Sequence, residues 1–524
     1  MALLEQSADR VSAALWNLHP QWAVALGKHE YDGQVPDVSG AVLEAGLDRL
    51  GRLRDQVAGL TGLTPDQELD REVLLGVVDR ERFDGEASRR WWRDPGWYLG
   101  ALGVAVYLER NYAPAGLRLE RAVAVLGEAG GLLAAARANL DEVIPRAWVE
   151  RAVAAARESA ARLVAVVGSP ASAGAPEEAA RLGEAAQRAA GELEAYAAWL
   201  EAERLPAAAD DFALGREGLE KWLQASEGLA RSAEDLAAVG AARLVEDREA
   251  LAADAAALAP GLPAAEACAR AAAGHPEADP STALTRSLEE ARRFVAGQGL
   301  VSPAGSLRIE SAMSPGPAGG EVGRLQAPGP YDDPATEAVL CLSAVPGAGA
   351  GRAALDELVV TAACPGRLVA ARHAARAPGE ARRRFPSRGM VEGWSLYAGD
   401  LMAEAGFKEE SPGWRLLWRR RVVVADCRLA MVPRLHAGDL SLPEAEEAFV
   451  REAGLAAAAA RAEALRCAAD PGSAAGALGR VEILAWRRRR REARGPGAAQ
   501  RAFHDALLAP GALPLGLLDR VLLP

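Results

Sequence analysis

The segment "EEAARLGEAAQRAAGELEAYAAWL" (177–200) carries the pattern that decides the fold class. Its apolar residues recur at spacings of four and three, which aligns them in one stripe along one face of a helix. Glu177 and Glu178 suit the first turn, because carboxylates there interact favourably with the positive end of the helix dipole. The sequence therefore predicts a long amphipathic helix after the breaker-rich stretch 168–176. Its apolar stripe consists of Leu182, Ala186, Ala189, Leu193, Tyr196 and Leu200.

The same helical pattern extends over most of the chain. The stretch 133–167 is typical of two helices interrupted at Pro145, because proline removes a backbone hydrogen bond from a helix interior. The stretch 233–258 predicts another helix, and helices resume near Asp356 and continue to the end. No fixed-period repeat occurs, which disfavours a solenoid.

A different composition lies between about 298 and 362, where proline and glycine are frequent. Within it, "LRIESAM" (307–313) and "EAVLCLSAV" (337–345) are typical of short strands. We therefore expect a mainly α-helical protein with one small β-sheet. An N-terminal helical part (1–297) and a C-terminal part (298–524) should together form one structural unit.

Composition restricts the class of protein and of partner. The 524 residues carry a net charge of −12, so nucleic acid is not an expected partner. No apolar run reaches membrane-spanning length, and the first residues acquire a charge at Glu5, unlike a signal peptide. The five cysteines are scattered without a CxxC pair, which indicates neither a disulfide framework nor a cysteine zinc site. We expect a cytoplasmic protein without membrane association, whose oligomeric state the sequence does not specify.

Several segments together resemble a large bacterial family, domain of unknown function 885. "VEGWSLYAGDLMAEAGF" (391–407) is similar to its EGW-x-LY-x-E-x-L-x-x-E-x-G signature. "RAFHDALLAPGALPLGLLDRVL" (501–522) is similar to its closing FHD-x-LL-x-x-G-x-LPL pattern, and 111–140 and 210–223 also fit in order. Members of this family resemble zinc metallopeptidases. The resemblance therefore implies a large multi-helix metallopeptidase-like body with the small β-sheet beside a central cleft. Its site should lie in this cleft, between segment 357–374 and the EGW helix.

In that family an HE-x-x-PGH motif precedes EGW. Two imidazoles and a downstream carboxylate bind Zn²⁺, and the motif glutamate takes a proton from the metal-bound water. In this sequence the first histidine falls on Thr361, the glutamate on Ala362 and the second histidine on Arg367. Only the downstream carboxylate is kept, as Glu392. The resemblance thus implies a degenerate member that has lost its zinc motif, and we expect neither metal nor cofactor.

Two further positions depart from the family pattern in the same way. The stretch 419–431 keeps Asp426 but has Ala430 where the resemblance places a histidine, and Gly476 stands at a family tyrosine. Loss of the metal would leave the Glu392 carboxylate in a poorly solvated cleft, where an unpaired charge is costly. We therefore expect the planar guanidinium of Arg367 to occupy the place of the cation and to pair with Glu392.

The expected cleft contains further candidates for chemistry. Trp394 and Tyr397 suit the core of their helix better than a ligand site, and a buried, inert thiol explains Cys364 better than a nucleophile activated by His373 does. The candidates for acid–base chemistry are Glu392, Arg367, His373, Tyr397 and Asp426. Those for substrate binding are Trp394, Arg372 and Cys364.

Three functions remain open. The first is a metal-free cleft repurposed for acid–base chemistry on a small molecule, such as an amino-acid-derived or biosynthetic intermediate. The second is a non-catalytic pseudopeptidase that binds a peptide or a partner protein. The third is a hydrolase with a metal site rebuilt from other donors, for which Glu392, His373, Cys364, Asp400 and Glu404 are the candidates. In each case we expect the ligand near Trp394 and Tyr397.

Overall fold

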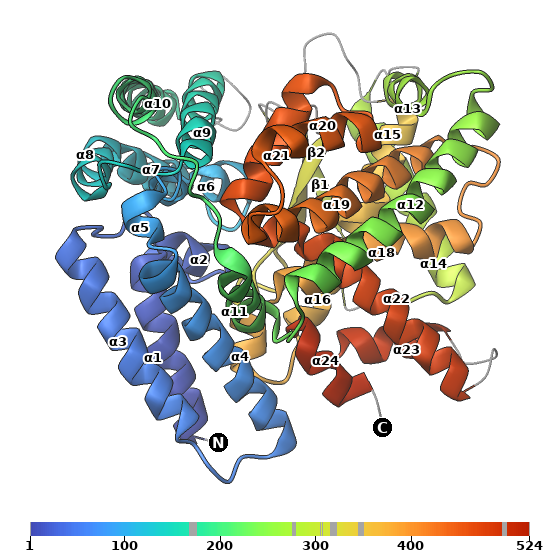
Figure 1. Cartoon of the computed structure of the whole chain (residues 1–524), viewed down its shortest axis with the longest axis horizontal. Helices are drawn as coiled ribbons and strands as arrows, with labels where there is room; N and C mark the ends of the chain where they lie inside the picture. Colours follow the sequence, from blue (N-terminus) through green and yellow to red (C-terminus); the bar gives the residue numbers. More distant parts are fainter. Residues whose placement is uncertain are drawn as a thin grey trace.

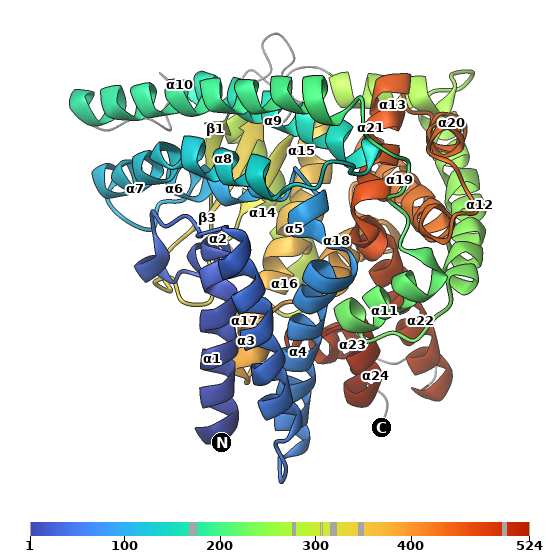
Figure 2. The same ribbon diagram turned by 60° about the vertical axis from the view of Figure 1, so that its left-hand side comes forward.

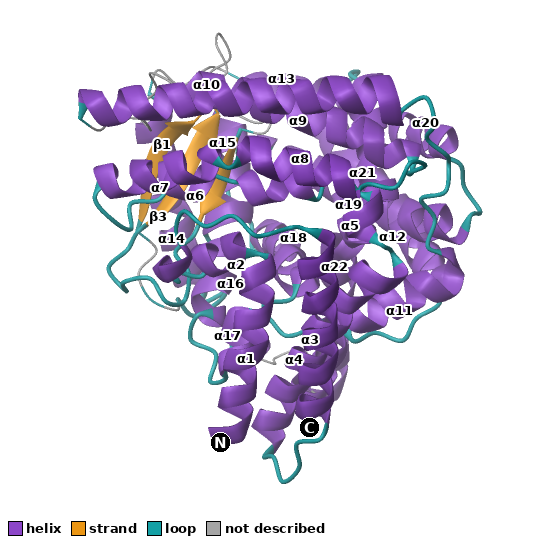
Figure 3. Cartoon of the chain, turned by 90° about the vertical axis from the view of Figure 1, so that its left-hand side faces the viewer, coloured by secondary structure: helices purple, strands orange, loops and turns teal. Residues whose placement is uncertain are grey.

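The computed structural model describes residues 2–166, 175–274, 279–303, 305, 308–314, 322–343, 351–494 and 500–522. Helices dominate this part of the chain, with one small sheet to one side, as Figure 3 shows. The expectation of a mainly α-helical fold with one small sheet is confirmed. No helix within the described ranges combines the length and the apolar character that crossing a membrane requires.

The N-terminal half forms a bundle of α1, α3 and α4 and a second layer around α10 (Figures 1 and 2). Its helices are α1 Ala2–Leu18, α2 Pro20–Ala25, η1 His29–Tyr31, α3 Gly40–Ala58, α4 Pro65–Arg82, η2 Phe83–Ala87, α5 Arg90–Arg93, η3 Tyr98–Leu102, α6 Ala105–Glu109, α7 Ala115–Gly127, α8 Ala129–Asn139, α9 Arg146–Val166, α10 Pro176–Trp199, η5 Leu200–Arg204, α11 Gly215–Glu227, α12 Ala233–Leu258, α13 Ala264–Ala273 and α14 Pro280–Gln298.

The C-terminal half surrounds a long central helix, α19. Its helices are α15 Arg352–Leu358, η6 Val359–Ala363, α16 Arg367–Ala374, α17 Glu380–Arg384, α18 Arg388–Glu404, α19 Gly413–Ala437, α20 Leu442–Ala453, α21 Ala457–Ala469, η7 Pro471–Ala474, α22 Ala475–Arg494, α23 Gln500–Leu508 and α24 Leu515–Leu522. In Figure 1, α12 lies beside α19, and the two helices pack extensively.

The helices predicted from periodicity form as expected. All six residues of the apolar stripe on 177–200 are buried, and that stripe packs against α7, α8 and α9. The break at Pro145 separates α8 from α9, and α12 covers 233–258. The breaker residues 168–174 lie outside the described residues.

The small sheet has three strands in the order β1-β3-β2. β1 (Ile309–Ser314) runs parallel to β3 (Ala338–Ser343), and β2 (Gly323–Gln326) runs antiparallel to β3 at the other edge. β3 is buried, which explains its continuous apolar sequence. The sequence did not predict β2, because four residues within a proline- and glycine-rich stretch show no alternation. Of the two predicted strands, residues 307, 344 and 345 lie outside the described residues.

Glycines allow the central helices of the C-terminal half to cross at close range. A Cβ on Gly393 of α18 would lie 2.6 Å from backbone atoms of Gly479 on α22. A Cβ on Gly240 of α12 would lie 2.5 Å from the backbone nitrogen of Ala430 on α19. Backbones in such contact leave no room for a side chain.

We predict that Gly393→Ala lowers the free energy of unfolding by about 1–3 kcal/mol, because the added methyl group forces two backbones apart. Gly191→Ala is the matched control, since Gly191 is exposed in the middle of α10 and a Cβ there would have no neighbouring heavy atom within 4 Å. That control should instead stabilise the protein by roughly 0.5–1 kcal/mol, because glycine is unfavourable inside helices. Urea unfolding measures both, and equal effects would contradict the close crossing.

Candidate functional site

The segment with the altered motif packs against α18, as the resemblance implies. It folds as α15, η6, a turn at 364–366 and α16. Two side chains of α18 hold this turn. The Trp394 indole Nε1 donates to the carbonyl of Pro365 at 2.8 Å, and the Ser395 hydroxyl donates to the carbonyl of Thr361 at 2.8 Å. The structure therefore brings the two predicted segments together, with Trp394 as a buried contact between them.

The motif positions themselves are filled by structural side chains. Thr361 is buried, and its hydroxyl donates to the carbonyl of Glu357 one turn earlier at 2.9 Å. Ala362 offers no donor or acceptor beyond its backbone. At Gly476, the family tyrosine position, a Cβ would lie 3.2 Å from the Cβ of Glu392, so α22 approaches α18 closely. Ala430 lies under Gly240 in the crossing of α12 with α19. Packing therefore replaces the lost side chains.

The expected salt bridge between Arg367 and Glu392 is wrong. Arg367 is exposed at the first residue of α16 and makes no ion pair with any described residue. Glu392 pairs instead with Arg388, whose Nε lies 2.9 Å from Oε1. The physical reason is local: Arg388 precedes Glu392 by one helical turn on α18, so the helix supplies its own cation.

Arg388 belongs to a charge network between the N-terminal helices and the C-terminal half. Its Nη1 donates to Asp470 at 2.6 Å, just before η7. Burial alone would raise the pKa of Asp470, but the guanidinium groups of Arg388, Arg90 and Arg80 hold this pKa well below its usual range. We define the charge network as Arg80, Asp84, Arg90, Asp94, Arg388, Glu392 and Asp470.

Water still reaches part of this network. The side chains of Arg388, Glu392 and Asp470 remain 43%, 33% and 21% exposed. Sequence reasoning identified Glu392 but missed Arg388 and Asp470. The Arg388–Glu392 spacing of four residues was a signal for the first, whereas no local pattern links Asp470 to α18.

Three other candidates do not converge: His373 and Arg372 bond to different backbone carbonyls, and Cys364 is buried. The imidazole Nε2 of His373 lies 3.0 Å from the carbonyl oxygen of Ser302, and burial lowers the pKa of His373. Arg372 Nη2 donates to the carbonyl of Thr336 at 3.3 Å. Cys364 is buried, and burial raises the pKa of its thiol to about 12, so it is not a thiolate nucleophile at neutral pH.

Tyr397 belongs to a buried polar cluster that joins α18 to the last helices. Nδ1 of His504 donates to the carbonyl of Leu300 at 2.6 Å, so Nε2 accepts the hydrogen bond of the Tyr397 hydroxyl at 2.8 Å. Arg487 Nη1 donates to the same hydroxyl at 3.2 Å. Burial lowers the pKa of His504 to about 4 and raises that of Tyr397 well above its usual range. The imidazole and the phenol are therefore fixed and uncharged, which fits a packing role.

Asp426 lies in a third place, inside the crossing of α12 and α19. Its carboxylate is fully buried, and neither oxygen receives a hydrogen bond from a described residue. Burial raises the pKa of Asp426 to about 8, and the neighbouring carboxylate of Asp247 adds to this rise against the opposing effect of Arg480. Asp426 is therefore mostly protonated near neutral pH.

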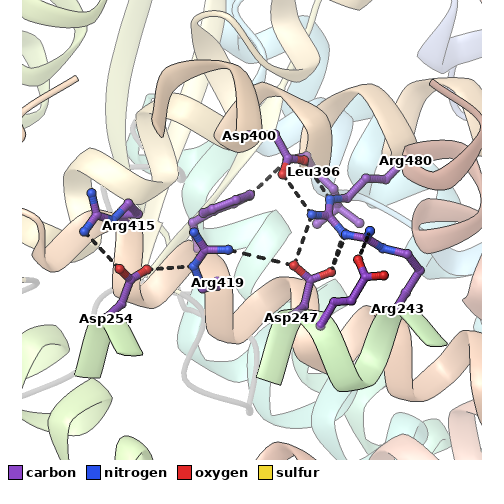
Figure 4. Close-up of polar contacts among 10 residues, drawn as sticks. Arg243, Asp247, Asp254, Leu396, Asp400, Arg415, Arg419 and Arg480 are labelled. Carbon is purple, nitrogen blue, oxygen red and sulfur yellow. Dashed lines mark hydrogen bonds and ion pairs between the residues drawn. The ribbon is translucent and has the colours of Figure 1, made fainter. Parts of the chain in front are cut away.

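Arg480 is the centre of the surrounding ion cluster, which Figure 4 shows. Its Nε lies 2.6 Å from Asp400 on α18, and its Nη1 lies 2.8 Å from Asp247 on α12. Only 2% of the Arg480 side chain is exposed, so this guanidinium holds α12, α18 and α22 together from within. Arg419 of α19 extends the cluster, with Nε 2.7 Å from Asp254. Sequence reasoning missed Arg480, although a single arginine among the mostly small and apolar residues 474–486 was a usable signal.

These residues do not fit a zinc ion. Thr361 uses its hydroxyl within the helix, Arg367 is a cation, and Glu392 is already ion-paired. The donors considered for a rebuilt site lie apart, since Asp400 is bound to Arg480 and His373 to a backbone carbonyl. Within the described ranges, no group of three or more His, Cys, Asp or Glu residues is placed to share a metal ion.

Comparison with known proteins extends the resemblance over the chain. A family model described as a bacterial protein of unknown function, DUF885, matches residues 20–522. A proposed lipoprotein of unknown function from Shewanella oneidensis superimposes with a TM-score of 0.73 at 20% identity, over 99% of this chain and 100% of that chain. A proposed lipoprotein from Colwellia psychrerythraea gives 0.73 at 16% identity, over 99% and 98%.

A more distant structure is an M32 carboxypeptidase from Deinococcus radiodurans R1, with a TM-score of 0.41 at 14% identity over 99% of this chain and 91% of that chain. No curated protein matches the sequence. At these identities, likeness to the Shewanella and Colwellia structures establishes the fold alone.

We predict opposite outcomes for two arginines. Arg480→Met should destabilise the protein by about 3–5 kcal/mol, because Asp247 and Asp400 lose their shared buried cation. Arg367→Met should change the free energy of unfolding by less than about 0.5 kcal/mol, since Arg367 is an exposed side chain. Chemical unfolding of both variants checks this. If Arg367→Met lowered the free energy of unfolding more than Arg480→Met, Arg367 would again be the candidate to replace the metal cation.

We also predict that Asp426→Asn flattens the pH dependence of stability. The pKa of Asp426 is about 8 in the folded state and about 3.9 in an unfolded chain. The folded state therefore binds the proton more tightly, and the stability contributed by this group is complete below about pH 4 and is lost as the pH rises towards 8. Asn keeps the shape of the side chain but cannot ionise, so this loss should disappear.

Urea unfolding between about pH 5 and 8, at constant salt, measures the difference. Asp439→Asn is the matched control, because Asp439 pairs with Arg216 and is about half exposed. If Asp426→Asn and the parent protein lose stability equally as the pH rises, the assignment of a proton to Asp426 is wrong.

Proposed function

We propose that this chain, which belongs to the bacterial DUF885 family, has lost metal-dependent hydrolysis and acts by binding a small charged molecule or a peptide. One observation carries this proposal: Thr361 and Ala362 offer no metal ligand, the exposed Arg367 is a cation, and Glu392 is neutralised by Arg388 of its own helix. A functional zinc site requires open, convergent donors and a free position for water.

The placement of the acid–base candidates favours binding over repurposed catalysis. His373 is engaged with the carbonyl of Ser302, Tyr397 is buried against His504, and Asp426 lies in the Arg480 cluster. General acid–base catalysis requires such groups within hydrogen-bond reach of one substrate. We therefore rank the non-catalytic pseudopeptidase above the metal-free enzyme, and the rebuilt hydrolase last.

The charge network is the best supported ligand site, and it lies at the N-terminal end of α18. Arg388 uses Nε for Glu392 and Nη1 for Asp470, and its Nη2 has no partner among the described residues. Nη2 is thus available to a ligand carboxylate, while the exposed faces of Glu392 and Asp470 suit an ammonium group. A molecule that carries both charges, such as an amino acid or a short peptide, matches this arrangement.

The proposed compartment is the cytoplasm, as expected from the sequence. The lipoprotein descriptions of the Shewanella and Colwellia structures concern those proteins. This location stays a prediction.

The first test is elemental analysis of the purified protein after dialysis against zinc. We expect far less than about one zinc ion per chain, because Thr361, Ala362 and Arg367 provide no imidazole or motif carboxylate. About one zinc per chain together with chelator-sensitive peptide hydrolysis would overturn the proposal.

The second test is thermal unfolding in the presence of unmodified dipeptides. A ligand that binds only the folded state raises the melting temperature, so at least one dipeptide should stabilise the parent protein. Arg388→Met should abolish this shift. Arg216→Met is the control, since Arg216 forms an exposed ion pair with Glu234 and Asp439 and should leave the shift unchanged. If the dipeptide raised the melting temperature of both variants equally, the ligand would not bind at Arg388.

A further inference from the structure

A cavity of about 220 Å³ lies in the N-terminal half, away from α18 and from the charge network. It is lined by η3, α6, α7, α9 and α10, it is partly open to solvent, and Arg324 of the edge strand β2 forms part of its wall. In Figure 2, α6, α7, α9 and α10 lie on the near side of the sheet. None of the residues predicted from the sequence to bind a ligand lines it.

Six of the fifteen residues that line this cavity are leucines. Protein interiors are normally packed so closely that few voids exceed the size of a water molecule. Water can bind at the charged side of this cavity, but the leucine side chains offer it no hydrogen-bond partner. An apolar ligand would regain the contacts that the leucines lack. The apolar wall consists of Leu99, Leu102, Leu108, Leu126, Leu163 and Leu193.

Three charged side chains lie at the same cavity. Glu109 and Arg324 form an ion pair, with Nε of Arg324 3.1 Å from Oε2 of Glu109, so these two charges neutralise each other. Arg162 pairs with Glu158 of its own helix at 3.0 Å. Its side chain is 36% exposed, and such exposed pairs within a helix are weak. Arg162 is therefore the cation that can turn to a ligand at little cost.

We propose that this cavity binds an aliphatic monocarboxylate, with its chain against the leucines and its carboxylate at Arg162. Pockets of this kind combine an apolar wall with a few polar groups that fix the orientation of the ligand. The guanidinium matches a carboxylate through two parallel hydrogen bonds. This inference is independent of the proposed function, because the charge network shares no residue with the cavity.

The test is isothermal titration of the full chain with decanoate and, in parallel, with decanol. We expect saturable binding of decanoate and at least about tenfold weaker binding of decanol, which lacks the charge. Arg162→Met should weaken decanoate by several-fold and leave decanol unchanged. No saturable decanoate binding, or equal affinity for both probes, would overturn the proposal.

A second pair of variants tests the location. Ala189→Phe places a ring into the cavity from α10, where Ala189 is buried and lines the wall. It should reduce decanoate affinity by at least about tenfold. Ala195→Phe on the exposed face of the same helix is the matched control and should bind like the parent. A folded Ala189→Phe protein with parental affinity would place decanoate elsewhere. If this variant does not fold, Arg162→Met, at a partly exposed position, still decides the outcome.

Discussion

The buried guanidinium of Arg480 is the constraint on which the C-terminal half depends. It is the shared partner of Asp247 and Asp400, so a shift of α12, α18 or α22 would leave a charge unpaired in the interior. Gly393 and Gly240 also restrict how the helices can move. At these glycines the backbones of α18 and α12 contact the backbones of α22 and α19 with no side chain between them. Charge pairing and close crossing thus fix α18 in one position.

A fixed α18 explains how the altered motif segment keeps its shape without a metal. Trp394 and Ser395 hold the turn at 364–366 through backbone carbonyl groups, and these bonds do not depend on the side chains at 361, 362 or 367. The shape of this segment therefore does not depend on which side chains stand at these three positions. Retention of the EGW signature reflects its role in packing as much as any chemistry, since Trp394 and Tyr397 are buried.

Periodicity predicted the elements whose packing is local. The stripe on α10, the break at Pro145 and the buried strand β3 each follow from residues within one short segment. The site was predicted less well. Spacing along the chain does not give distances between elements, so Arg367 was placed beside Glu392 when Arg388, one turn away, already neutralised it. Asp426 was recognised as a special position, but its burial beside Asp247 depends on α12, which is remote in sequence.

The Arg480 cluster also affects folding during synthesis, because its members leave the ribosome at different times. Asp247 leaves the ribosome long before its buried partner Arg480, which lies 233 residues later in the sequence. Until then Asp247 has only Arg243 of its own helix and Arg419 of α19 as cations, whereas Asp400 of α18 has no ion-pair partner among the described residues. Tyr397 likewise lacks its hydrogen-bond partner His504 until 107 further residues have been synthesised. We therefore expect α18 to complete its packing only after the last helices have emerged, and its apolar face is until then the kind of surface that favours aggregation and that chaperones protect.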